Sequence, residues 1–276
     1  MFQTSHEYAG FHGAARCVSG GPIYITDTPG KHDINLIAQM TAQTTRGKTI
    51  ILRPTIVGKS IDPYNAYSAQ ALLKIGTYAG RAVTGTGILG LFNCSGQSLS
   101  EFVSLSDFPG TEQGEYIVGS FTSGQTSAPM SRGGEKSMVG AELGIRGWDV
   151  LTAYPLQTFE VGGKKVKVGV LGLVGKMTGS AAIVNSDATT QTGGRIKVWT
   201  SLKALGVLGV YISDLEKRTV QENFMVLIFS KPVPVHCVKV GERCSKVLEV
   251  DVDRAWREMG LETGWSNEVS VEVIIS

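Results

Sequence analysis

The first forty residues show the apolar spacing of two helices separated by a strand. Thr4 followed by Glu7 fits a capping box, which predicts a helix that begins near Ser5. Apolar residues then recur at intervals of three and four, which places them on one helical face: Tyr8, Phe11, Ala15 and Val18. Gly20, followed by a second glycine, predicts the end of this helix.

A continuous apolar run at residues 22–26 follows that helix and predicts a strand buried on both faces, as in parallel sheets covered by helices. Asp27 comes directly after the strand, residues 28–30 form a turn, and Asp33 can cap a second helix. The apolar stripe of that helix holds Ile34, Ile37 and Met40.

This helix–strand–helix order amounts to roughly one and a half repeats of a β/α barrel, a fold whose chemistry lies at the carboxyl ends of the strands. Asp27 occupies such a position and is therefore a candidate functional residue. The alternative is a structural role, in which its carboxylate caps the following loop through Thr28 and Gly30.

Beyond residue 42 the spacing changes to period two. Valines alternate with Lys or Gly at positions 166–170, directly after the Gly162-Gly163 pair, and a similar alternation follows Gly193-Gly194. Another run of alternating valines covers positions 269–273. Such patterns predict antiparallel hairpins with one solvated face, assembled as a β-sandwich. One helix is expected at residues 254–259, capped by Asp253 and ended by Gly260.

The N-terminal residues also resemble a known family. The similarity is carried by residues 1–4, His6, residues 11–12, 14–16 and 19–24, Asp27, and residues 29–30 and 32–33. In this arrangement they resemble the raffinose synthase family, which with the seed imbibition proteins and alkaline α-galactosidases lies in glycoside hydrolase family 36. Weaker similarity continues through residues 52–53, 72–75, 92–94 and 260–265.

The resemblance implies a fold and an origin for each part of the chain. Residues 1–44 would be the last segment of a TIM (β/α)8 barrel, comprising helix 7, strand 8 and helix 8, and residues 45–276 would be an antiparallel β-sandwich domain. The expected fold is therefore mainly β with a β/α remnant. The family's nucleophile, an aspartate in a Lys-x-Asp sequence, and its acid/base carboxylate would both lie upstream of this chain.

The resemblance also implies a function. Family members transfer an α-galactosyl group, with retention, from galactinol or a raffinose-type sugar to sucrose or to water. Gln3, His6 and Asp27 would line the mouth of the pocket, because an amide, an imidazole and a carboxylate suit hydrogen bonding to sugar hydroxyls. This chain is interpreted as a C-terminal fragment, inactive alone because retaining chemistry needs two carboxyl groups about 5 to 5.5 Å apart.

A function of another class stays open. The chain could be a non-catalytic carbohydrate-binding or structural β-sandwich module, which should expose aromatic rings on one sheet face for sugars to stack on. The candidates are Trp148, Trp199 and Trp265.

Composition restricts the partners. The 276 residues are 42% hydrophobic, and 26 basic against 24 acidic side chains give a formal net charge of +2. This balance offers no electrostatic reason to expect nucleic acid or a membrane surface and suits neutral sugars such as raffinose, galactinol and sucrose. The absence of a signal peptide or a long apolar stretch predicts a cytoplasmic protein, and four cysteines are too few for a disulfide scaffold.

No cofactor or metal is expected. Residues 85–90 fit G-x-G-x-x-G, but a strand-like run follows where a nucleotide site needs a helix. His6 and His12 are six apart, so they do not share a helical face. His236, Cys237 and Cys244 lack the paired spacing of structural zinc sites, and no fourth ligand is evident in the sequence.

Overall fold

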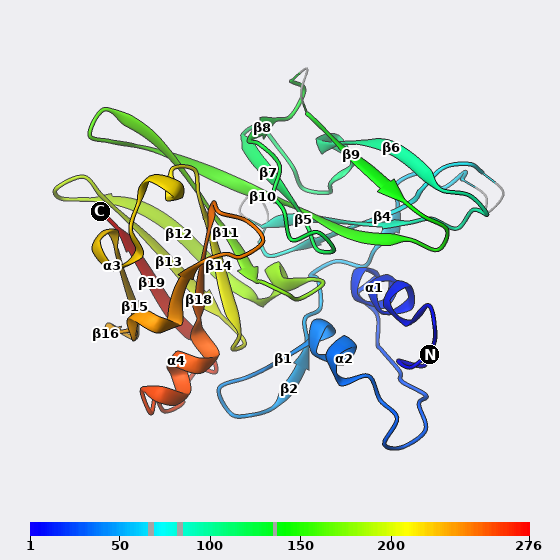
Figure 1. Ribbon diagram of the computed structural model, residues 1–276, viewed down its shortest axis with the longest axis horizontal. Helices are drawn as coiled ribbons and strands as arrows, with labels where there is room; N and C mark the ends of the chain where they lie inside the picture. Colours follow the sequence, from blue (N-terminus) through cyan, green and yellow to red (C-terminus); the bar gives the residue numbers. More distant parts are fainter. Residues whose placement is uncertain (66–68, 82–84, 135–136) are drawn as a thin grey trace. The chain divides into compact units, whose positions relative to one another are not determined.

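The structure is a computed structural model that describes residues 1–65, 69–81, 85–134 and 137–276 (Figure 1). The residues beyond position 42 that alternate with period two form antiparallel strands in it. The chain packs as two units. Unit 1 comprises Met1–Thr41, Ile51–Tyr154 and Lys176–Thr178, and unit 2 comprises Ala42–Ile50, Pro155–Gly175 and Gly179–Ser276.

Unit 1 combines two helices with an antiparallel sheet. Its elements are α1 (Ala9–Ser19), α2 (Ile34–Met40), β3 (Lys59–Ser60), β4 (Leu73–Ala79), β5 (Thr86–Phe92), β6 (Leu99–Ser104), η1 (Leu105–Asp107), β7 (Glu115–Ser120), β8 (Met130–Ser131), β9 (Met138–Leu143) and the first part of β10 (Trp148–Val161). The order of pairing is β3, β4, β5, β10, and β6 pairs with β9. Helix α1 packs against β4 and β5 (Figure 1).

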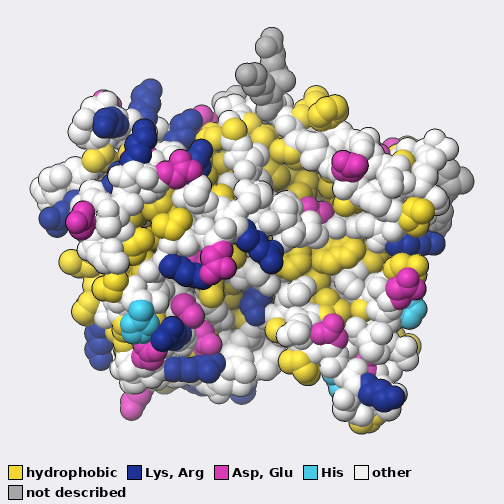
Figure 2. Space-filling model, viewed as in Figure 1, with side chains coloured by type: hydrophobic (Ala, Val, Ile, Leu, Met, Phe, Trp, Pro, Cys, Tyr) yellow, Lys and Arg dark blue, Asp and Glu magenta, His cyan; other side chains and the backbone are white. Residues whose placement is uncertain are grey.

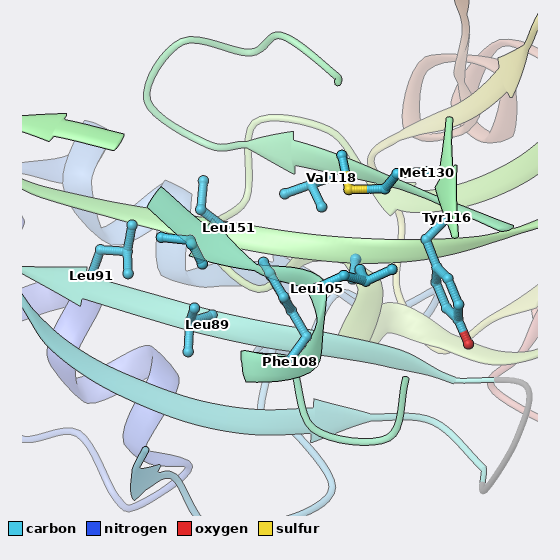
Figure 3. Packing of buried hydrophobic residues seen from close by; sticks show 10 residues of the cluster. Leu89, Leu91, Leu105, Phe108, Tyr116, Val118, Met130 and Leu151 are labelled. Carbon is cyan, nitrogen blue, oxygen red and sulfur yellow. The ribbon is translucent and has the colours of Figure 1, made fainter. Parts of the chain in front are cut away.

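The core of unit 1 lies over β5 and β10. Leu89, Leu91 and Leu151 project from these strands, and Phe108 and Tyr116 cover them from the following loop and β7. In Figure 3 the ring of Phe108 lies beside Leu89. Leu89 is fully buried, so the burial of this cluster contributes to the stability of the unit.

Unit 2 is built from hairpins. Its elements are β1 (Thr41–Gln43), β2 (Thr49–Ile51), the second part of β10, β11 (Lys164–Leu173), η2 (Gly179–Ala182), β12 (Ile183–Gln191), β13 (Arg195–Leu202), β14 (Val207–Ile212), η3 (Leu215–Lys217), α3 (Val220–Asn223), β15 (Phe224–Ile228), β16 (Lys231–Pro232), η4 (Val235–Cys237), β17 (Val238–Val240), β18 (Val247–Asp251), α4 (Val252–Glu258) and β19 (Val269–Ile275).

Two antiparallel sheets run through unit 2. One follows the order β10, β11, β14, β18, β17, and the other follows β12, β13, β19, β15, β16. Gly162 and Gly163 both have positive φ and join β10 to β11, as the sequence predicted. Along β19, buried and half-buried residues alternate from Val269 to Ile275, which confirms the period-two interpretation of that run.

The predicted helix starts need correction. Helix α1 begins at Ala9, not near Ser5, and Tyr8 precedes it without a capping side chain. The reason is that the Thr4 hydroxyl donates to Asp27 and does not cap. The predicted end is confirmed, because Gly20 adopts a left-handed φ of 67°. The predicted cap of α2 by Asp33 is also confirmed, since its carboxylate accepts from Leu36 N at 3.0 Å.

The expectation of a doubly buried strand at residues 22–26 is wrong. Only Ile25 forms a bridge there, and Tyr24 is 61% exposed. Helix α4 also differs from its prediction, because it spans Val252–Glu258 and the capping carboxylate is that of Asp251. Asp253 lies in the first turn instead and pairs with Arg257 at 2.8 Å.

A mainly β chain with antiparallel sheets is therefore confirmed. The assignment of residues 1–44 to a barrel, the division at 44/45 and the sandwich arrangement of residues 45–276 stay predictions. Within the described parts of the chain, none of the helices combines the length and apolar character needed to cross a bilayer. Basic and acidic side chains intermix on the face seen in Figure 2.

We predict that Leu89→Ala lowers the stability of unit 1 by about 2 to 5 kcal/mol, because it leaves a cavity in a close-packed cluster. Chemical denaturation followed by fluorescence measures this loss. Phe102→Ala is the control, since that ring is 77% exposed and its removal should change stability by less than about 0.5 kcal/mol. Equal losses in the two variants would show that the core is not where the structure places it.

Candidate functional site

A short parallel pairing brings the N-terminus beside residues 22–26. Phe2 N–H donates to Tyr24 O at 3.1 Å, and Thr26 N–H donates to Phe2 O at 3.0 Å. This makes the parallel bridge between Phe2 and Ile25. Because Phe2 is buried, with 7% exposure, the pairing fixes the residues that follow it next to Asp27.

The Asp27 carboxylate holds the loop after Phe2. Its Oδ1 accepts from Thr4 N at 2.8 Å, and its Oδ2 accepts from Thr4 Oγ1 at 2.7 Å. Ser5 adds longer contacts to Oδ1, from its backbone nitrogen at 3.3 Å and its hydroxyl at 3.4 Å. The structural role foreseen for Asp27 is thus present, but its described partners are Thr4 and Ser5, not Thr28 and Gly30.

Thr4 connects this carboxylate to α2. Its hydroxyl donates to Asp27 and accepts from Asp33 N at 2.8 Å, while Asp33 caps the helix through Leu36. Thr4 is only 2% exposed, so its hydroxyl depends on these protein partners rather than on water. Sequence reasoning missed this role, because Thr4 and Glu7 matched a capping box that does not form.

Hydrogen bonding keeps Asp27 ionised. Desolvation raises its pKa, but the hydrogen bonds from the Thr4 side chain and from the backbone of Ser5 and Thr4 outweigh it. The net effect is a pKa below the ordinary value of a carboxyl group. At neutral pH the site therefore presents a negatively charged acceptor.

Gln3 and His6 lie on the loop that Asp27 holds. Both are exposed, and Gln3 lies between the buried residues Phe2 and Thr4. His6 N–H donates to Gln3 O at 3.4 Å, and His6 Nδ1 accepts from Tyr8 N at 3.1 Å. The structure thus brings the three predicted residues into one region, with Asp27 at its anchored end.

A second imidazole borders this region. The rings of His6 and His12 meet edge to face, with centroids 6.1 Å apart. Burial lowers the pKa of His12, and the nearby charges of Arg16, His6 and Arg146 lower it further. Arg16 also donates to Met1 O at 3.2 Å and lies over the Phe2 ring at 5.7 Å. His12 was not among the predicted site residues.

The arrangement suits binding better than bond cleavage. An exposed amide, an exposed imidazole and a charged carboxylate can hydrogen-bond to a neutral polyhydroxyl ligand. Both carboxylate oxygens of Asp27 already accept hydrogen bonds from Thr4. Asp27 therefore anchors the loop and is not available as a nucleophile. Among the described residues, the side chains close enough to share a metal ion are His236, Cys237 and Glu258, and they lie in unit 2.

The family described as raffinose synthase or seed imbibition protein Sip1 matches residues 1–106. A probable galactinol–sucrose galactosyltransferase 1 of Arabidopsis thaliana is 28% identical over 246 residues, covering 80% of this chain and 31% of the relative. A galactinol–sucrose galactosyltransferase of Oryza sativa subsp. japonica is 36% identical over 102 residues, covering 35% of this chain and 12% of the relative.

The chain thus spans about a third, 31%, of the length of the Arabidopsis relative that it matches. Among solved structures, alpha-galactosidase I from Mortierella vinacea aligns with a TM-score of 0.33 and 12% identity, covering 53% of this chain and 35% of that one.

We predict that Thr4→Val destabilises unit 1 by about 1 to 3 kcal/mol, because it leaves a carboxylate oxygen and the Asp33 N–H without their partner. Thr4→Ser is the matched control, since it keeps the hydroxyl and should stay close to the wild type. Thermal unfolding of the three proteins measures the difference. Identical melting of the Val and Ser variants would exclude the hydroxyl as the connection between Asp27 and α2.

Proposed function

This chain is a relative of the raffinose synthase and seed imbibition protein family, and from this premise we propose that it is part of a protein that acts on α-galactosyl oligosaccharides. The substrates would be galactinol, raffinose-type sugars and sucrose. The observation that carries the proposal is the anchored Asp27, which holds the loop bearing Gln3 and His6 within the matched residues 1–106.

The finer proposal concerns the place of this region in the fold. Residues 1–44 would form the end of a β/α barrel of glycoside hydrolase family 36, and residues 45–276 a β-sandwich. The parallel bridge between Phe2 and Ile25 supports it, because neighbouring strands of a β/α barrel run parallel. Gln3, His6 and Asp27 would then lie at the carboxyl ends of two adjacent strands, where such barrels bind substrate.

The three residues would position the sugar rather than react with it. Retaining transfer needs a nucleophilic carboxylate and an acid/base carboxyl group about 5 to 5.5 Å apart. Asp27 is the one carboxylate in the proposed set, and Thr4 and Ser5 hold it. We therefore propose that this chain alone neither transfers nor hydrolyses galactosyl groups.

One observation favours a second function, a carbohydrate-binding module. Trp265 is fully exposed, as a ring that stacks on sugars must be. The other two candidate tryptophans contact residues of the chain itself. Trp148 stacks on Phe121 with centroids 5.8 Å apart, and Trp199 Nε1 donates to Ser270 Oγ at 2.7 Å. A single exposed ring is weaker support than the anchored site, because isolated exposed aromatic residues are common.

We predict that residues 1–44 can replace the matching region of the rice galactosyltransferase with galactosyl transfer retained. In that chimera Asp27→Ala should lower kcat/KM on the order of 100-fold, because the loop that positions the sugar loses its anchor. Lys31→Ala, at an exposed position of the same segment, is the control. Product chromatography with galactinol and sucrose measures transfer. A folded chimera in which Asp27→Ala transfers as fast as the control would exclude the proposed role.

Activity and titration measurements on the unaltered chain distinguish the two proposed functions. We expect no galactose release from raffinose and no heat when raffinose, galactinol or galactose is titrated into it. Heat that disappears in Trp265→Ala, but persists in Tyr24→Ala, would favour the binding module, since both rings are exposed. Release of galactose by the purified chain would contradict the proposal that it is inactive alone.

A further inference from the structure

Three donor groups of different chemistry meet where η4 faces α4 in unit 2. His236 Nε2 lies 2.6 Å from Glu258 Oε2, and Cys237 Sγ lies 4.0 Å from the same oxygen. One ligand atom from each residue lies within 4.8 Å of the other two. The site described above lies in unit 1 and shares no residue with this cluster.

The backbone on both sides of the cluster is fixed by packing. In α4, Ala255 is fully buried and Trp256 is 7% exposed, with its ring edge-on to Phe229 at 6.0 Å. Asp251 caps the helix by accepting from Arg254 N at 3.0 Å. In η4, Cys237 is 2% exposed and its N–H donates to Pro234 O at 2.9 Å. The donors therefore stand on anchored elements, as a metal site requires.

We propose that His236, Cys237 and Glu258 bind one zinc ion, with water as the fourth ligand. Imidazole, thiolate and carboxylate are the three protein donors that zinc accepts, whereas magnesium and calcium prefer oxygen alone. Three protein ligands leave one coordination position open. The proposal is independent of any action on sugars.

The distances fit a zinc ion after small movements. Zn–N and Zn–O bonds near 2.0 Å and Zn–S bonds near 2.3 Å set donor atoms about 3.3 to 3.6 Å apart in a tetrahedron. The His236 to Glu258 distance of 2.6 Å would open and the Cys237 to Glu258 distance of 4.0 Å would close. The side chains of His236 and Glu258 are 55% and 36% exposed, so both have room to adjust and the ion has a path from solvent.

A further residue orients the carboxylate. Arg254 Nε donates to Glu258 Oε1 at 2.7 Å, which leaves Oε2 directed at His236 and Cys237. A partner that fixes the unligated oxygen of a carboxylate is a common feature of zinc sites. Sequence reasoning weighed His236 and Cys237 with Cys244 and found no further ligand. Glu258 could not be predicted as a ligand from the spacing, because it lies on a helix 21 residues beyond Cys237.

The test uses the full chain, stripped with a chelator and then titrated with zinc against a chromophoric competitor. We expect one equivalent of zinc to bind. Cobalt in place of zinc should give the visible spectrum of a tetrahedral site and a thiolate charge-transfer band in the near ultraviolet. That band reports Cys237 directly and does not depend on enzymatic activity.

Variants assign the ligands. Cys237→Ser and His236→Gln should each weaken zinc binding by more than the roughly 10- to 100-fold that loss of an outer partner costs. Cys244→Ser and His32→Gln are the matched controls and should bind as the unaltered chain does. If Cys237→Ser fails to fold because that residue is buried, His236→Gln at an exposed position carries the test.

Two results would overturn the proposal. One is that the unaltered chain binds no more zinc than the double variant that lacks the His236 and Cys237 side chains. The other is cobalt binding without a thiolate band and with equal affinity in His236→Gln, which would place the ion elsewhere on the chain.

Discussion

The N-terminal part of this protein depends on one carboxylate. Asp27 accepts two hydrogen bonds from Thr4, and the Thr4 hydroxyl in turn accepts from Asp33, which caps α2. Residues 2–8, residues 22–27 and the start of α2 are thereby linked through two buried or half-buried polar side chains. A charged acceptor with short bonds of 2.7 and 2.8 Å is strong enough to organise a segment with little regular structure.

The same interaction explains why the candidate site has its present form. Gln3 and His6 are exposed, yet the backbone between and beside them is held at Phe2 and Thr4. Polar groups that bind a neutral sugar need such a fixed frame, because each hydrogen bond is worth little if the side chain must first be ordered. The anchor uses both oxygens of Asp27, and this is why positioning, not bond cleavage, is the role proposed for it.

Much of the β architecture could be predicted because its signals are local. The Gly162-Gly163 turn and the alternating run along β19 are specified by neighbouring residues, and so is the cap of α2 by Asp33. The contact between Thr4 and Asp27 spans 23 residues and has no local signal. It also competes with a local pattern, since Thr4 and Glu7 match a capping box whose threonine is engaged elsewhere. Tertiary bonding therefore displaced the start of α1 to Ala9.

The burial of residues 22–26 could not be predicted from the sequence either. Its apolar composition indicates a strand covered on both faces, whereas Tyr24 is largely exposed and Ile25 alone is bridged. Composition reports what a segment can bury, not what covers it. The cluster of His236, Cys237 and Glu258 is likewise invisible to spacing rules, because it forms only where η4 meets α4.

Amide hydrogen exchange tests the central claim most directly, by comparing the unaltered chain with Asp27→Asn. The account predicts that Thr4 N–H, which donates to Asp27, and Thr26 N–H, which donates to Phe2, are protected in the unaltered chain. Both amides should exchange markedly faster in the variant, while amides of β5 and β19 should keep their rates. Unchanged protection of Thr4 and Thr26 in Asp27→Asn would contradict the claim that this carboxylate holds the N-terminal segment together.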